Sequence, residues 1–159
     1  MPKTLSAWFV LAAGIMAIVG LWTSTSLGDS AMDLSIHDTY FVIANHHLVL
    51  ASAFLCLLCA FIYWGFQKWT KHRINGTLGL IHLGMTAIGL IGIITPLHLM
   101  TSVSAPRRYY EYSAVVPTDG YSWMADANST VSGSAIVCLI GQIVLLANII
   151  LTLARRPAA

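Results

Sequence analysis

The sequence predicts an all-α integral membrane protein, a bundle of four transmembrane helices with both termini on the cytoplasmic side. Only 9% of its 159 residues are charged and 57% are hydrophobic, whereas a soluble domain carries about 25% charged residues. Four apolar segments are each long enough to cross a hydrocarbon core, which needs about 20 residues. The composition therefore excludes a soluble domain and indicates a surface that is largely covered by lipid.

The four helices are expected to form one membrane domain over residues 1–159. We place them at about Ser6–Leu27, Tyr40–Phe66, Gly76–Val103 and Val131–Leu153. The first segment exceeds the apolar stretch of about 7–15 residues found in a cleaved signal peptide, so we interpret it as a retained helix. The second and third are longer than one span requires, and we expect them to tilt or to extend beyond the membrane. A long loop, Ser104–Thr130, precedes the last helix.

The basic residues predict how the chain is oriented. Six of the eight Lys and Arg residues fall on one side of the membrane: Lys3, Lys68, Lys71, Arg73, Arg155 and Arg156. All six Asp and Glu residues fall on the other side. Because cytoplasmic loops are enriched in Lys and Arg, the basic side is predicted to be cytoplasmic. We expect the protein to lie in a bacterial inner membrane with both termini inside.

Histidines and an arginine pair gather at outer-leaflet depth. His46 and His47 lie in the second helix, His98 lies near the outer end of the third, and Arg107 and Arg108 follow it. Ionisable side chains within a span are costly and usually functional. Imidazole nitrogens are axial ligands of heme iron, and guanidinium groups hold carboxylates such as propionates in bidentate pairs. The pattern therefore predicts a heme site.

Each of these residues also has a structural interpretation, which stays open. The arginine pair fits an ordinary interfacial anchor, and a membrane histidine is often only a hydrogen-bonding residue between helices. We favour that hydrogen-bonding role for His82, and for His98 both roles remain open. Cys56 and Cys59 are spaced as in a redox or metal motif, but we interpret them as small apolar residues one helical turn apart.

A longer stretch carries a family resemblance. Residues His37 to Leu50 read H-D-T-Y-F-V-I-A-N-H-H-L-V-L, which resembles the tenth-helix signature of heme–copper oxidase subunit I, H-D-T-Y-[YF]-V-V-A-H-F-H-Y-V-L. Further similarity, without a gap through Tyr109, lies in Ile81-His82, Pro96-Leu97-His98-Leu99 and Ser104-Ala105-Pro106-Arg107-Arg108-Tyr109. The family motifs there read I-H-F, P-Q-H-F and S-G-M-P-R-R-Y. The chain thus resembles the last four, ninth to twelfth, of that subunit's twelve helices.

The resemblance implies roles for individual residues. His47 matches the axial ligand of the low-spin heme, and the arginine pair matches the residues that bind heme propionates. His37 and Asp38 match a pair beside a magnesium site, and magnesium is therefore a second cofactor to consider. The alternative for this pair is a hydrogen-bonded junction in which Asp38 caps the second helix. His82 and His98 match family histidines that are not iron ligands.

One departure from the family motif changes the expected function. Asn45 stands where the family has the proximal ligand of its oxygen-binding heme. An amide is a poor iron ligand, and the family's copper ligands lie on helices outside this resemblance. We therefore expect no catalytic residues and no terminal oxidase, but a low-spin bis-His heme used for electron transfer. Heme b is favoured over heme a, because heme a needs dedicated synthesis.

The predicted heme site needs a second axial ligand. It is expected to come from a neighbouring copy, as His46, His47 or His98, in a homotrimer or homodimer with heme near the interface. The alternative function is a heme-free structural or assembly subunit of a larger respiratory complex. An enzymatic role, as a heme-dependent oxidoreductase, also stays open. We expect lipid and respiratory-chain subunits as partners and no nucleic acid.

Overall fold

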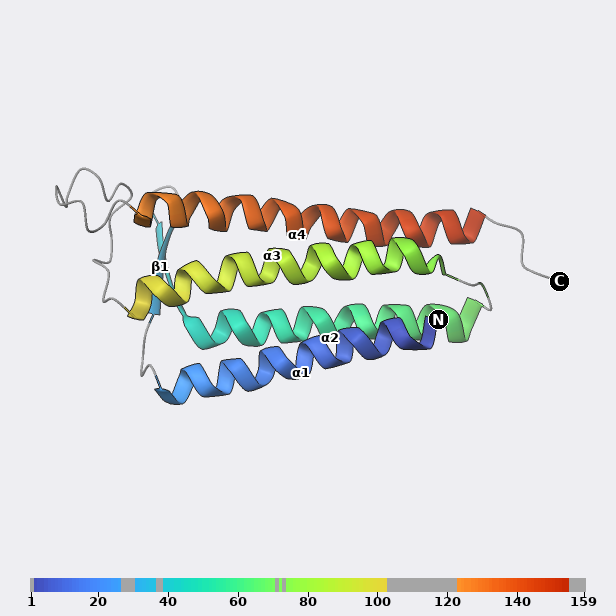
Figure 1. Ribbon diagram of the computed structural model, residues 1–159, viewed down its shortest axis with the longest axis horizontal. Helices are drawn as coiled ribbons and strands as arrows, with labels where there is room; N and C mark the ends of the chain where they lie inside the picture. Colours follow the sequence, from blue (N-terminus) through green and yellow to red (C-terminus); the bar gives the residue numbers. More distant parts are fainter. Residues whose placement is uncertain are drawn as a thin grey trace.

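The computed structural model describes residues 2–26, 31–36, 39–70, 72, 74–102 and 123–154. Four long helices, lying side by side along the long axis of the molecule in Figure 1, dominate this part of the chain. They are α1 (Pro2–Ser26), α2 (Asn45–Thr70), α3 (Gly76–Ser102) and α4 (Trp123–Ala154). Each contains a segment long and apolar enough to cross a membrane. The prediction of four membrane helices is therefore confirmed.

The helices expose large apolar side chains rather than charged ones. Trp22 is 70% exposed, Phe54 68% and Ile88 66%. A soluble protein rarely leaves so much contiguous apolar surface in water, and hydrocarbon is the medium that such a surface fits. The inward faces hold a core to which α1, α2, α3 and α4 all contribute, with residues such as Phe9, Tyr63, Leu90 and Leu145. The protein is an integral membrane protein.

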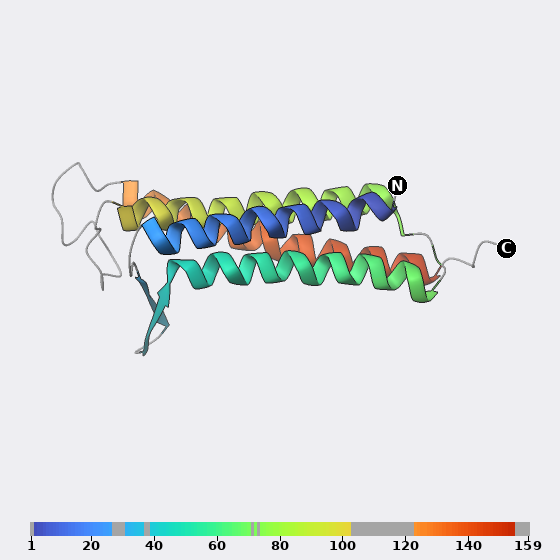
Figure 2. The same ribbon diagram turned by 90° about the horizontal axis from the view of Figure 1, so that it is seen from below.

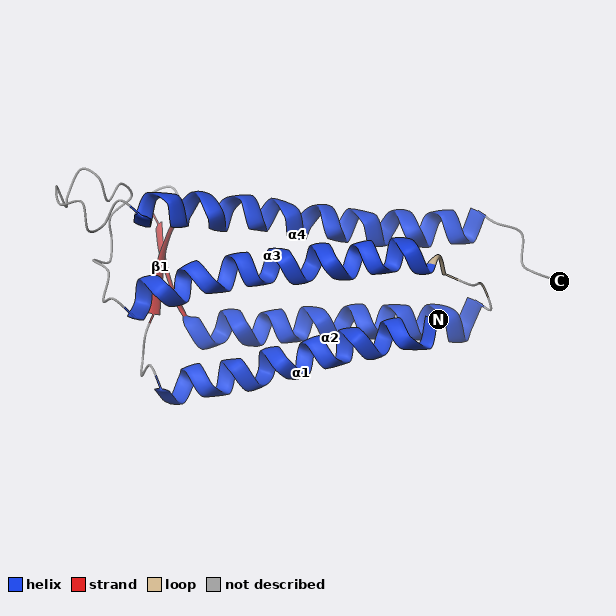
Figure 3. Cartoon of the chain, in the orientation of Figure 1, coloured by secondary structure: helices blue, strands red, loops and turns tan. Residues whose placement is uncertain are grey.

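A β-hairpin, which the sequence analysis did not predict, precedes α2. Strand β1 (Ala31–Ile36) pairs antiparallel with strand β2 (Thr39–Ala44), and Figure 3 shows the two strands at one end of the bundle. The second helix was expected to begin at Tyr40 but begins at Asn45. Residues Tyr40–Ile43 are aromatic or β-branched, which favours strands, and their apolar character had been counted as part of the span.

The other helix bounds differ from the predictions at their polar ends. Helix α1 begins at Pro2 rather than Ser6, and α4 begins at Trp123 rather than Val131. The added turns of α4 contain Asp126, and an acidic residue in the first turn interacts favourably with the helix dipole. Polar residues are tolerated there because these turns extend beyond the apolar segment, which begins at Ser129.

The bundle consists of two tightly packed helix pairs. Helix α1 packs along α2, and α3 packs along α4, whereas the two pairs touch each other at fewer points. Glycines allow the close approach of α3 and α4: a Cβ atom at Gly89 would lie 2.8 Å from the backbone nitrogen of Cys138. At Gly92 a Cβ would collide with Ser134. Small residues of this kind are typical of helix interfaces in membranes.

Successive helices run in opposite directions. The beginning of α1 and the end of α4 therefore lie at the same end of the bundle, as Figures 1 and 2 show. We call this the termini end, and the opposite end, which carries β1 and β2, the hairpin end. The arrangement is the one that the predicted orientation requires. That the termini end faces the cytoplasm stays a prediction.

Candidate functional site

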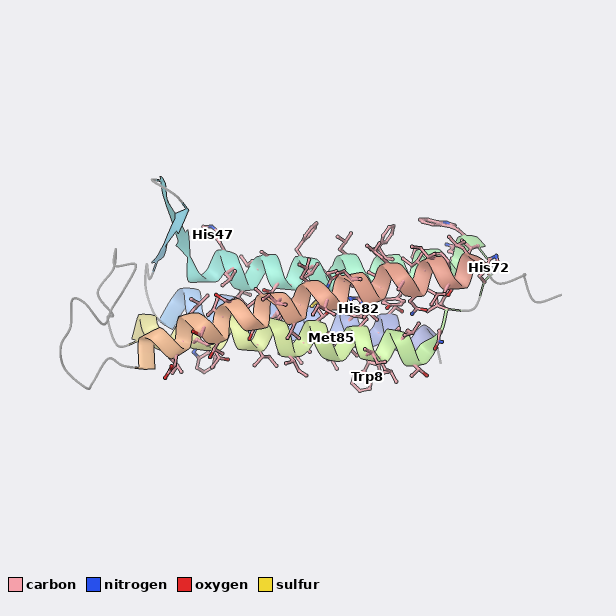
Figure 4. All side chains as sticks on the ribbon, turned by 90° about the horizontal axis from the view of Figure 1, so that it is seen from above. Trp8, His47, His72, His82 and Met85 are labelled. Carbon is pink, nitrogen blue, oxygen red and sulfur yellow. The ribbon has the colours of Figure 1, made fainter. Side chains whose placement is uncertain are left out.

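His47 lies near the start of α2 at the hairpin end, and its side chain is exposed. Figure 4 shows it projecting from α2 away from α3 and α4. Two residues further on, Val49 is fully buried and lies against Gly20 of α1. Since successive residues of a helix are about 100° apart, burying Val49 against α1 turns His47 to the outside of the bundle.

His98 lies near the end of α3, also at the hairpin end. Its side chain is half-buried, and its Nε2 atom is buried without a hydrogen-bond partner among the described residues. A buried polar atom without a partner costs about 1–3 kcal/mol. The ligand role of His98 therefore stays a hypothesis, now with an unpaired nitrogen in its favour.

Several predicted site residues lie outside the part of the chain that the structure describes. These are His37 and Asp38, proposed near magnesium, and Arg107 and Arg108, proposed to hold propionates. The side chain of His46 is also outside the described set. The magnesium site and the arginine clamp accordingly stay predictions.

Asn45, the departure from the family motif, is the first residue of α2. Asn is among the residues preferred at helix N-termini, because its side chain can accept a hydrogen bond from the first backbone amides. In a chain whose second helix begins at this residue, an amide in place of an imidazole suits the local backbone. That Asn45 leaves the chain without the ligand of an oxygen-binding heme stays a prediction.

A buried polar cluster, which the sequence analysis did not identify as a group, lies further inside the bundle. The Tyr63 hydroxyl and His82 Nδ1 share a hydrogen bond of 3.0 Å, and His82 Nε2 lies 4.0 Å from Cys59 Sγ. Tyr63 and His82 are fully buried, and the ring of Phe9 packs on both. The prediction that His82 serves as a hydrogen-bonding residue between helices is confirmed.

Gln142 of α4 connects this cluster to a third helix. Its Oε1 accepts a hydrogen bond from Cys59 Sγ at 3.8 Å, and its Nε2 donates to Thr86 Oγ1 at 3.2 Å. We call Cys59, Tyr63, His82, Thr86 and Gln142 the central polar cluster. The sequence held one usable signal: His82 and Thr86 are four residues apart, which places two polar side chains on one face of an apolar helix.

A second polar contact lies at the termini end. Asn148 Nδ2 donates to the backbone oxygen of Asn75 at 3.0 Å. The Asn75 side chain in turn accepts a hydrogen bond from the backbone amide of Thr77 at 3.0 Å and so caps α3. Together with the central polar cluster, this contact fixes α3 and α4 relative to each other.

The described donors at the hairpin end are single imidazoles, His47 and His98. Within the described residues there is no group of three or more His, Cys, Asp or Glu side chains that could hold a metal ion. A heme iron is already held by four porphyrin nitrogens and needs only single imidazoles at its axial positions. The exposed imidazole of His47 has the chemistry of such a donor, and its ligand role stays a prediction.

The chain is similar to subunit 1 of bacterial cytochrome c oxidases. The chain is 30% identical over 152 residues to the alternative cytochrome c oxidase subunit 1 of Bradyrhizobium diazoefficiens. This alignment covers 94% of this chain and 25% of that protein. It is 33% identical over 110 residues to the cytochrome c oxidase subunit 1 of Thermostichus vulcanus, in an alignment that covers 68% of this chain and 20% of that protein. The chain thus spans a quarter or less of the length of these relatives. No solved structure matches it.

The similarity extends over most of the described helices. The family model of cytochrome C and quinol oxidase polypeptide I matches residues 1–133, which include α1, α2, α3 and the first turns of α4. His47, His82 and His98 all fall within this match. With this coverage, and with four apolar helices in the structure, the chain belongs to the cytochrome c and quinol oxidase polypeptide I family, of which it resembles a part.

Proposed function

We propose that this protein binds heme in the membrane and transfers electrons within a homo-oligomer, without reducing oxygen. The observation that carries the proposal is His47, an exposed imidazole that projects from α2 at the hairpin end. Membership of an oxidase subunit family supports it. When bound, the heme would supply reversible one-electron transfer.

The residues of the chain would hold the group and limit its chemistry. His47 would be an axial ligand, and Arg107 and Arg108 would pair with the propionates. Two imidazole ligands would leave the iron without a site for oxygen, and Asn45 would supply no ligand for a second heme. We favour heme b over heme a, and a magnesium ion at His37 and Asp38 belongs to the same proposal.

The membrane would place this site near the outer surface. Lys68 lies in the last turn of α2 at the termini end, and Arg155 and Arg156 follow α4 in the sequence. The positive-inside rule would then orient the hairpin end outwards in a bacterial inner membrane. Exposed apolar side chains of the helices would keep water from the inner part of the bundle. His47 would then face an electron donor or acceptor near the outer leaflet.

The proposal is tested on protein purified in detergent. Pyridine hemochrome analysis should show heme, and the visible spectrum should be that of low-spin, bis-imidazole iron. His47→Ala should lose the heme, because one axial ligand is removed. His72→Ala is the matched control, because His72 lies at the opposite end of the bundle, and it should keep its heme.

Two results would contradict this function. Protein without any heme would favour the alternative of a structural or assembly subunit in a respiratory complex. An unchanged spectrum in the His47→Ala variant would show that His47 is not a ligand. A circular dichroism spectrum unchanged between variants would show that both are folded.

A further inference from the structure

We propose that one heme is shared by two copies of this chain, with His47 from each copy as its two axial ligands. This inference rests on the proposed function and names its partner: a second copy docked against the outer face of α2. We define this face by the exposed residues His47, Leu50, Ala51, Phe54, Leu57, Phe61 and Trp64.

No helix among the described residues covers the α2 face. The opposite side of α2 is buried, through Val49, Cys56, Cys59 and Tyr63, and packs against the rest of the bundle. Residues three or four positions apart lie on the same side of a helix, so His47, Ala51 and Phe54 form one continuous strip. All three are exposed, and Phe54 is exposed by 68%.

The described histidines of the same chain do not supply a ligand to this face. His82 is fully buried inside the bundle and is engaged by Tyr63 and Cys59. His98 has its Nε2 buried, whereas His47 projects outwards. His72 follows α2 at the termini end. A lipid chain could cover the α2 face but has no ligand for iron, whereas a second copy brings an identical imidazole.

The strip carries only a small side chain next to His47. The residue one turn further along the same side is Ala51, whose side chain is a single methyl group. Leu50, 43% exposed, and Phe54, 68% exposed, flank it with apolar surface. Ala51 would thus leave room for a porphyrin held by His47, and Leu50 and Phe54 would offer it apolar surface. A large side chain at Ala51 would occupy that space.

The remaining residues of the α2 face suit two copies that have the same orientation, with a gap between their α2 helices. In a twofold dimer the same patch serves both partners, and both copies must have the same orientation in the membrane. Further along α2, Phe61 is 52% exposed and Trp64 49%, with Lys68 Nζ 4.7 Å from the centre of the Trp64 ring. These bulky residues would fill the wide gap that a heme imposes between two α2 helices.

Heme stoichiometry gives the first test. Pyridine hemochrome combined with quantitative amino-acid analysis should give one heme per two chains, and native mass spectrometry should detect a dimer carrying one heme. Wild-type protein without heme would refute the proposed function itself. One heme per chain, or heme in a monomer, would leave that function standing and overturn the shared site.

A substitution in the strip gives the second test. Ala51→Trp should lose most of the heme, because the indole fills the space beside His47. Ala135→Trp is the matched control, since Ala135 is an exposed alanine on α4, and it should bind heme like the wild type. Equal heme content in the two variants, both folded by circular dichroism, would overturn the placement on α2.

Mixed dimers distinguish a heme bound by two His47 residues from a ring-shaped oligomer, such as a homotrimer, in which the second ligand is another residue. His47→Ala and wild-type chains carrying different affinity tags are co-expressed, and the species with both tags is isolated. A twofold site has lost one of its two ligands there, so the mixed dimer should lack the bis-imidazole spectrum. A mixed species that keeps this spectrum would show that the second ligand is a different residue and would overturn the proposal.

Discussion

Single residues explain how polar groups are accommodated inside this apolar bundle. The Tyr63 hydroxyl, the His82 ring and the Gln142 amide each have a partner on another helix. In a membrane a polar side chain without a partner meets hydrocarbon, and an interhelical hydrogen bond contributes about 0.6–2 kcal/mol. The central polar cluster therefore joins α2 to the α3–α4 pair, which α2 otherwise touches at few points.

Tyr63→Phe is predicted to weaken this junction. It removes the hydroxyl 3.0 Å from His82 Nδ1 while keeping the ring that stacks on Phe9. The free energy of unfolding, measured by titration with a denaturing detergent, should fall by about 1–2 kcal/mol. Ile18→Leu, at an exposed side chain of α1 outside the α2 face, should change it little. An equal loss in both variants would contradict the role of the hydroxyl.

The same cluster shows what sequence alone leaves undetermined at this scale. A polar residue in an apolar run, such as His82, indicates a need for a partner. Which partner it finds depends on how the helices are rotated and shifted against each other, and Cys59 and Gln142 lie 83 positions apart. The hydrogen-bonding role of His82 was predictable, but its partners Tyr63 and Cys59 were not.

At the scale of elements, length and hydropathy were sufficient to predict the four helices. The β-hairpin was missed because Tyr40–Ile43 is as apolar as the helix that follows. A hydropathy window does not distinguish a strand beside a span from the span itself, although the aromatic and β-branched residues of β2 are the usual strand formers. The pairing of α3 with α4 was likewise not predicted, because it depends on close approach at glycines.

Gly89→Ala is predicted to disturb the α3–α4 pair. The added Cβ would lie 2.8 Å from the backbone nitrogen of Cys138, and backbone cannot move aside as a flexible side chain can. Overpacking of this kind costs about 1–3 kcal/mol, measurable in the same detergent titration. Gly84→Ala is the control, since a Cβ there meets nothing within 4 Å. A loss in the control as large as at Gly89 would refute the contact.

At the scale of the whole molecule, the antiparallel order of the helices places the two described chain ends together and the hairpin opposite them. This follows from the number of spans, which sequence analysis supplied correctly. The side of the membrane on which each end lies depends on charge, and not on any contact inside the bundle. The orientation of the bundle in the membrane is therefore best tested by an experiment in cells.

Labelling of single added cysteines should show the termini end inside the cell. Thr77→Cys is exposed at the start of α3, near the termini end, and Asp126→Cys is exposed near the hairpin end. A membrane-impermeant maleimide should label Asp126→Cys in intact spheroplasts, and Thr77→Cys only after they are permeabilised. The parent protein is the control, because Cys56 and Cys59 are buried and Cys138 is half-buried within α4.

The prediction of this orientation rests on the six basic residues assigned to the inner side. The reverse labelling pattern would show that the bundle has the opposite orientation, with His47 near the cytoplasmic leaflet. The proposed function would then require an electron-transfer partner on that side.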